Sequence, residues 1–240
     1  MKTLVTLLLL IVGTTVCWSF TDQKKINGSG KVVTENRTAG TFDKIHVARS
    51  VDLFLTQGNT PSIRVEADDN LISLIQTKVE GSTLIIRLPN DIRLGTYEKM
   101  NVYVTTAMLT ELEATTSADI EGQGTWNVKD IEISASTSAD IELNINANKI
   151  NAKASTSGDI ELKGKAEVLT ATASTSGDIK AKELVAQKVS ATASTSGDIS
   201  VYAEKEISYS ASTSGDISYR GNPVIKEAHT STSGSAYKIK

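Results

Sequence analysis

A unit of about 19 residues repeats through the second half of this chain and constrains its fold more than any other feature. Its constant part is the motif S-T-S-[GA]-D-I, in which the aspartates follow one another at intervals of 21, 19, 19, 20 and 18 residues. A seventh copy near residue 231 has Ser235 in place of the Asp. Self-similarity at such a period is typical of solenoids, whose terminal copies deviate from the consensus. The six aspartates are Asp119, Asp140, Asp159, Asp178, Asp198 and Asp216.

Alternation within each unit predicts β-strands that line a narrow core. Leu169, Ala171 and Ala173 share one parity, and polar residues occupy the other. The Thr of the motif shares the parity of the inward Ala, so we expect it to point inward, and we expect the Gly to supply unusual backbone angles at a corner. Nineteen residues at about 3.3 Å each trace a loop of roughly 60 Å, the circumference of a slim coil. The sequence therefore predicts an all-β parallel β-helix. The large apolar residue nine positions before each Asp should form one core column, comprising Ile131, Ile150, Leu169, Val189 and Ile207.

Residues 41–105 lack the motif but keep strand alternation. Asp52-Leu53 has the form of a diverged Asp-Ile pair, so the coil is expected to begin here. Asp68, Asp69 and Asn70 precede a short apolar run at 71–75, which predicts a short capped helix over the open end of the solenoid. A strand pair is predicted next, with its turn at 80–82.

The first residues have the pattern of an export signal. Lys2 precedes an apolar run at 4–12 that is too short to span a bilayer, and no later stretch predicts a transmembrane segment. Cys17, the only cysteine, falls inside this region, and its acylation would tether the protein to a membrane. Val16, directly before it, is atypical of a lipoprotein signal. The sequence therefore favours ordinary cleavage by a signal peptidase. The predicted organisation is a signal peptide (1–19), a linker (20–40), an N-terminal part of the β-helix with a helical insert (41–105) and regular coils (106–240).

The order of motifs in the N-terminal half resembles a known family. The segments that carry the resemblance are Phe42…Ile45-His46-Val47, Val51-Asp52-Leu53, Ile63 to Asp68, Asn70-Leu71 and Val79…Gly81-Ser82-Thr83-Leu84, followed by the Asp-Ile coils. In order and content they resemble the auto-transporter adhesin head domain called the GIN domain, over about residues 40–220. The resemblance implies a right-handed β-helix of secreted or surface proteins from Bacteroidetes-type bacteria and an adhesin-like role.

Charge and chemistry narrow the function. With 25 Lys and Arg against 28 Asp and Glu, the chain has no basic excess that would favour nucleic acid. Neither His46 nor His229 has a visible catalytic partner in the sequence, and the repeated acids are too uniform for a catalytic centre, so no catalytic residue and no cofactor are predicted. We expect an exported, non-enzymatic module at the cell surface or in the periplasm that binds a glycan or protein or serves as a scaffold. The alternatives are a polysaccharide-active enzyme and a purely structural envelope protein, and no oligomeric state is predicted.

The six aspartates should form an acidic column along one edge of the solenoid. Neighbouring charges one coil apart repel by roughly 0.8 kcal/mol in water, so we expect hydrogen bonds from corner N–H groups and Ser hydroxyls to offset the repulsion. The alternative is that this column binds Ca²⁺, whose ligands are oxygen atoms.

Overall fold

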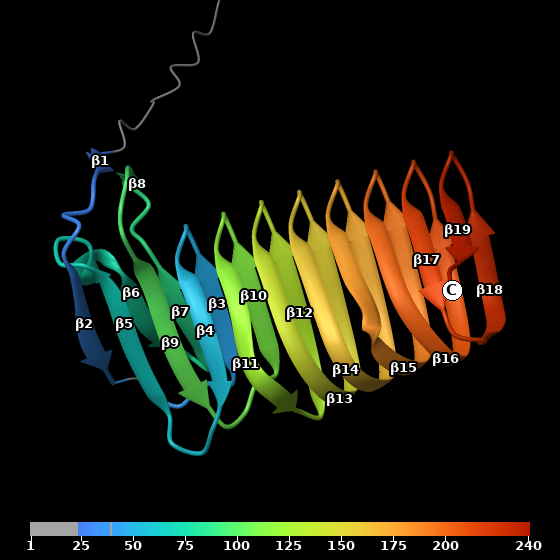
Figure 1. Ribbon diagram of the computed structural model, residues 1–240, viewed down its shortest axis with the longest axis horizontal. Coiled ribbons are helices and arrows are strands. Elements are labelled where there is room, and N and C mark those ends of the chain that lie inside the picture. Colours follow the sequence, from blue (N-terminus) through green and yellow to red (C-terminus); the bar gives the residue numbers. More distant parts are fainter. Residues whose placement is uncertain (1–23, 39) are drawn as a thin grey trace, which may run out of the picture.

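The computed structural model describes residues 24–38 and 40–240, and within them the chain forms a β-solenoid of about 7 turns with about 19 residues per turn. The predicted signal peptide and Cys17 lie outside the described residues. Figure 1 shows the coils stacked side by side, with narrow corners along one edge and wide arches along the other. The right-handed sense of the coil stays a prediction. Among the described residues, no helix has the length and apolarity needed to cross a bilayer.

Each regular coil contributes one strand segment to each of two opposing faces. The first segment begins at the Asp of the motif, passes round the arch, and continues as the second segment up to the next corner. All pairings between successive coils are parallel, as predicted. The strands of this part are β10 (Glu111–Thr115), β11 (Asp119–Asn127), β12 (Asp130–Ser136), β13 (Asp140–Ser155), β14 (Asp159–Ser174), β15 (Asp178–Ser194), β16 (Asp198–Ala211), β17 (Asp216–Arg220), β18 (Val224–Thr230) and β19 (Ser235–Lys238).

The core consists of columns of identical or similar side chains. The predicted apolar column is confirmed, since its members pair with one another in register and are at most 4% exposed. Ala columns on the same strands keep the two faces close together. Each column is continuous only because the coils stack, so no single repeat can bury its apolar side chains alone.

The corners correct two predictions. The residues with left-handed backbone angles are the Thr and the central Ser of each motif, as in Thr175 (φ 51°) and Ser176 (φ 60°), whereas the Gly that follows, Gly177, has no positive φ. Because the chain turns through this left-handed pair, strand alternation ends before the Thr, and the Thr side chain is exposed instead of inward. Gly is required for a different reason: a Cβ on Gly177 would lie 2.6 Å from backbone atoms of Ala154 and Ser155 in the neighbouring coil.

The first coil is formed by residues that lack the motif. Strands β3 (Lys44–Ala48) and β4 (Asp52–Gln57) stack in parallel on β10 and β11, with Leu53 paired to Ile120. This register confirms that Asp52-Leu53 is a diverged copy of the Asp-Ile pair. Strands β7 (Thr83–Arg87) and β9 (Met100–Thr106) stack on the other side of β3 and β4.

Antiparallel strands close the N-terminal end. Strand β2 (Val32–Arg37) pairs with β5 (Ser62–Asp68), which pairs with β9. Strand β6 (Gln76–Glu80) forms the predicted hairpin with β7, with Gly81 at φ 64° in its turn. Strand β1 (Lys24–Ile26) pairs with β8 (Ile92–Leu94). Residues 24–37 therefore contribute two strands, although they fall within the segment expected to be a linker.

The predicted capped helix at 71–75 is instead a single 3-10 turn, η1 (Ile72–Leu74), whose first residue receives no side-chain cap. The expected capping residues bind a different segment. Buried Asp68 accepts the backbone N–H groups of Gly30, Glu98 and Lys99 at 2.9–3.1 Å, and Asn70 accepts that of Ser29 at 2.9 Å. Because these side chains hold the N-terminal segment, they are not available to start a helix.

Candidate functional site

The six aspartates of the motif form one continuous acidic column. Each is in register with the next, from Asp119 to Asp216, and Ser235 continues the column in the last coil. At the other end, the pairing of Leu53 with Ile120 places Asp52 beside Asp119. Each Asp begins its strand directly after a corner, so the regular coil geometry places the side chains at one edge.

The column has fewer hydrogen-bonding partners than expected. Lys180 donates to Asp159 at 2.8 Å, and in the last coil the Ser235 hydroxyl donates to Asp216 at 2.6 Å. The N–H of the central Ser in each corner donates instead to the Thr carbonyl of the next coil, at 3.0–3.1 Å. The corners thus form a ladder mainly through backbone carbonyls, and the expected bond from an N–H group to a carboxylate is found from Asp216 to Asp198, at 3.2 Å.

Burial and mutual repulsion raise the pKa of several members of the column. Partial burial and the neighbouring Asp119 raise the pKa of Asp52 from its ordinary 3.8 to about 6. Burial together with the adjacent aspartates raises the pKa of Asp119 and of Asp178, while a backbone N–H of the next coil acts in the opposite direction at both. The ionised column therefore opposes folding near neutral pH.

Replacing Asp52 with Asn is expected to stabilise the protein at pH 7. A raised pKa means that the folded state binds the proton of Asp52 more tightly than the unfolded state does. Protonation of Asp52 therefore stabilises the wild type fully below pH 3.8, and this contribution is lost as pH rises through about 6, whereas Asn is neutral at every pH. The difference between the two pKa values corresponds to about 3 kcal/mol of unfolding free energy for an isolated buried group. Because Asp52 is only half-buried, solvent screening reduces the gain that we expect from Asp52→Asn to about 1 kcal/mol. Urea denaturation of Asp52→Asn and wild type at pH 7 and pH 4 measures it; equal stability at pH 7 would contradict the prediction.

A groove of about 270 Å³ runs beside the column. It is lined by Asp119, Asp140 and Asp159 together with the Glu two residues after each, and by Lys180. Lys163, on the same face, pairs with Glu142 at 2.8 Å. Within the described part of the chain, three potential metal-ligating side chains whose ligand atoms lie within 4.8 Å of one another are found at His46, Glu111 and Glu113. The aspartates of the column do not form such a group and instead lie in a row, one in each coil. Calcium binding by the column stays the alternative interpretation, which a melting-temperature titration with Ca²⁺ tests.

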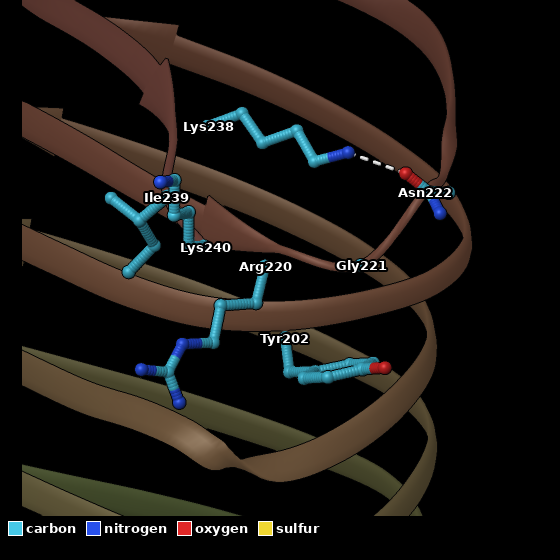
Figure 2. A pocket seen from close by; sticks show the side chains of 7 residues that line it. All are labelled: Tyr202, Arg220, Gly221, Asn222, Lys238, Ile239 and Lys240. Carbon is cyan, nitrogen blue, oxygen red and sulfur yellow. Dashed lines mark hydrogen bonds between the residues drawn. The ribbon is translucent and has the colours of Figure 1, made fainter.

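A second concave site lies at the arch of the last coils. It is a pocket of about 600 Å³, lined by Tyr202, Arg220, Gly221, Asn222, Lys238, Ile239 and Lys240. Figure 2 shows Tyr202 and Arg220 on neighbouring coils, where their backbones are in register, and Lys238 donating a hydrogen bond to the Asn222 side chain. Arg220 Nε is buried and has no hydrogen-bond partner among the described residues. The pocket combines an aromatic ring, cationic groups and an amide.

The other aromatic residues of the regular coils belong mainly to the core. Trp126 is 1% exposed and Tyr219 is 9% exposed. Half-buried Tyr209 stacks on Tyr219 with 6.1 Å between ring centroids. Tyr209 and Tyr219 thus pack at the core, and Tyr202 remains as a half-buried ring that lines the pocket.

His46 has partners that sequence reasoning missed. It points outward from β3, between the buried residues Ile45 and Val47, and lies 2.8 Å from Glu111 and 3.4 Å from Glu113. The two glutamates are more than 60 residues away in sequence, so no local pattern indicates the contact. The signal that could have found it is the coil register, once β3 is aligned with β10.

Comparison with known proteins places the chain in a family. No curated protein matches it. The fold is similar to that of a putative adhesin from Bacteroides fragilis, with a TM-score of 0.83 and 23% identity over 89% of this chain and 99% of that one. The fold is also similar to that of a putative lipid binding protein from Parabacteroides distasonis, with a TM-score of 0.72 and 27% identity over 90% of this chain and 100% of that one. The family model described as "Putative auto-transporter adhesin, head GIN domain" matches residues 41–223, more than half of the chain. This protein therefore belongs to the auto-transporter adhesin head GIN domain family.

Proposed function

We propose that this protein is an exported, adhesin-like binding module at the cell surface or in the periplasm, and that its ligand is a glycan. Membership in the adhesin head family supports the general role. The stacked coils form a rigid rod with long regular faces, which suits binding rather than a chemistry that needs moving parts. The export signal predicted at 1–19 supports the location, and the alternative with a lipid anchor at Cys17 places the same module on a membrane.

The pocket at the last arch is the observation that carries this proposal. The half-buried ring of Tyr202 lines the pocket and can pack against the apolar face of a sugar, and the neighbouring amide and cationic groups can bind its hydroxyl and carboxylate oxygens. Arg220 can donate two parallel hydrogen bonds to a carboxylate, and Lys238 adds a second positive charge. The seven lining residues include no acidic side chain. We therefore propose a carboxylated glycan, such as one that contains uronic acid.

Arg220→Ala is expected to weaken binding of an acidic oligosaccharide at least about tenfold, because it removes a charge-assisted hydrogen bond together with its positive charge. Isothermal titration with oligogalacturonate, with a neutral oligosaccharide as comparison, measures the change. Lys188→Ala is the matched control, since Lys188 is an exposed cation on β15 outside the pocket. Equal binding by Arg220→Ala and wild type would exclude this pocket as the site.

The remaining alternatives make different predictions in the same experiments. A protein ligand predicts no glycan binding but retention of a partner on the immobilised domain. A polysaccharide-active enzyme predicts shortening of the oligosaccharide during the titration. A purely structural envelope component predicts neither.

A further inference from the structure

His46, Glu111 and Glu113 form a cluster on the outer face of the first coils. His46 lies in the middle of β3, and Glu111 and Glu113 lie two residues apart on the adjacent β10. Their side chains point outward because the residues between them, Leu112 on β10 and Ile45 and Val47 beside His46, are buried in the core. All three are 27–40% exposed.

The geometry of the cluster fits three ligands of one divalent metal ion. One imidazole nitrogen and two carboxylate oxygens lie within 4.8 Å of one another. Ligands of a tetrahedral Zn²⁺, at about 2.0–2.2 Å from the metal, lie roughly 3.4 Å apart. His46 Nε2 is 3.4 Å from Glu113 Oε2 and 2.8 Å from Glu111 Oε1, so small side-chain rotations bring all three to bonding distance.

The scaffold holds these ligands in place. Strand β3 is paired on both sides, by β7 and β10, and β10 is paired by β3 and β12. Lys44 donates to the second oxygen of Glu111 at 2.8 Å, which orients this carboxylate and leaves Oε1 toward His46. Hydrogen bonds of this kind commonly fix the carboxylates that bind metals. Glu132, in register with Glu111 on the next coil, is ion-paired with Lys153.

The cluster also breaks the symmetry of the repeat. A surface ion pair needs no such break, and it contributes only about 0–1 kcal/mol to stability. The residues in register with Glu113 in the following coils form a column. This column includes no other acid or imidazole until the last coil, where it reaches His229. The successive members from the next coil onward are Ser134, Lys153, Thr172, Thr192 and Ser210.

We propose that His46, Glu111 and Glu113 bind a divalent transition metal of the Zn²⁺ class, with the fourth position open to water or to a carboxylate of a ligand. This site is separate from the Arg220 pocket and does not depend on the proposed glycan binding. Lys44 is a positioning residue for Glu111. The mixed nitrogen and oxygen ligands favour Zn²⁺ over Ca²⁺, which prefers oxygen ligands alone.

Isothermal titration of the untagged protein with Zn²⁺ tests the proposal. We expect one saturable site with a Kd in the micromolar range, and binding at least about tenfold weaker in His46→Ala and in Glu113→Gln. The chain has one other histidine, so His229→Ala is a matched control and is expected to bind as wild type does. The visible spectrum of the Co²⁺-loaded protein gives a second readout, whose ligand-field bands should disappear in His46→Ala and remain in His229→Ala.

Thermal melting without metal shows whether each variant is folded, and Glu113→Gln keeps the test valid if His46→Ala is unstable. The absence of saturable Zn²⁺ binding below about 1 mM would overturn the proposal. Undiminished binding by folded His46→Ala or Glu113→Gln would do the same.

Discussion

Asp68→Ala is expected to lower the free energy of unfolding by about 3 kcal/mol. The Asp68 side chain is fully buried and accepts three backbone N–H groups, from Gly30, Glu98 and Lys99, which join the N-terminal segment to the loop before β9. Without the carboxylate these three N–H groups lose their acceptor beside the buried site of Asp68, and each lost bond to a charged group costs about 1 kcal/mol or more. Urea denaturation measures the loss, and hydrogen exchange should be faster in residues 24–37 than in β13–β16.

Asp69→Ala is the matched control for this prediction. Asp69 is the adjacent acid, and its side chain is 37% exposed and accepts the Ser29 hydroxyl at 2.6 Å. We expect a loss below about 1 kcal/mol, because solvent can replace that contact. If Asp69→Ala and Asp68→Ala were equally destabilised, the buried backbone contacts would not be the cause.

The pH dependence gives an independent check on Asp68. Burial alone would raise the pKa of Asp68, but the N–H groups of Gly30, Lys99 and Glu98 outweigh it and hold the pKa below its ordinary 3.8. A lowered pKa stabilises the fold above pH 3.8, and this contribution is lost as pH falls through the lowered value. The acid limb of the stability profile should therefore be shallower in Asp68→Ala. This effect is opposite in sign to that of Asp52.

Gly177→Val is expected to destabilise the regular coils by about 3 kcal/mol. The Cβ would lie 2.6 Å from the carbonyl carbon of Ala154 and from the amide nitrogen of Ser155. These are backbone atoms of a stacked strand, so they cannot move away without breaking the ladder between coils, and overpacking of this kind typically costs 1–3 kcal/mol. The Gly177 N–H also donates to Ser174 at 3.0 Å, a bond that closes the corner. Guanidinium denaturation of the variant measures the loss.

Two natural coils provide the reference for this position. Ala118 and Ala139 replace the Gly in the first two copies of the motif, and neither forms the corner-closing N–H bond that Gly177 makes. We expect Gly177→Ala to open the corner in the same way, with an intermediate loss of about 1–2 kcal/mol. Ala139→Gly should change stability little. A Gly177→Val protein as stable as wild type would show that the coils can separate locally at little cost.

Local pattern was sufficient to predict the regular coils. Leu169 and Ala171 alternate with polar residues along their strand, so their inward direction follows from strand geometry alone. The inward direction predicted for the Thr is wrong because alternation holds only within a strand, and the backbone angles predicted for the Gly belong to the two residues before it. Thr175 lies in a left-handed turn, and the contact that excludes a Cβ at Gly177 comes from another coil.

The candidate sites were only partly predictable. The acidic column follows from equal spacing, since residues one coil apart are necessarily neighbours in a solenoid. The cluster at His46 depends on the pairing of β3 with β10, which no local pattern indicates. The pocket at Arg220 depends on how the chain passes round the arch of the last coils. The capped helix predicted at 71–75 is wrong because the side chains of Asp68 and Asn70 bond to residues about 30 to 40 positions away.

The parallel coil, its core columns and the row of aspartates all follow from the repeat, because in a solenoid each residue contacts its own counterpart one coil away. Tertiary structure alone decided the closure of the N-terminal end, the direction of the corner side chains and the partners of His46. Those features depend on contacts between segments that differ in sequence. Their free energy comes from distant atoms, which a local pattern does not encode.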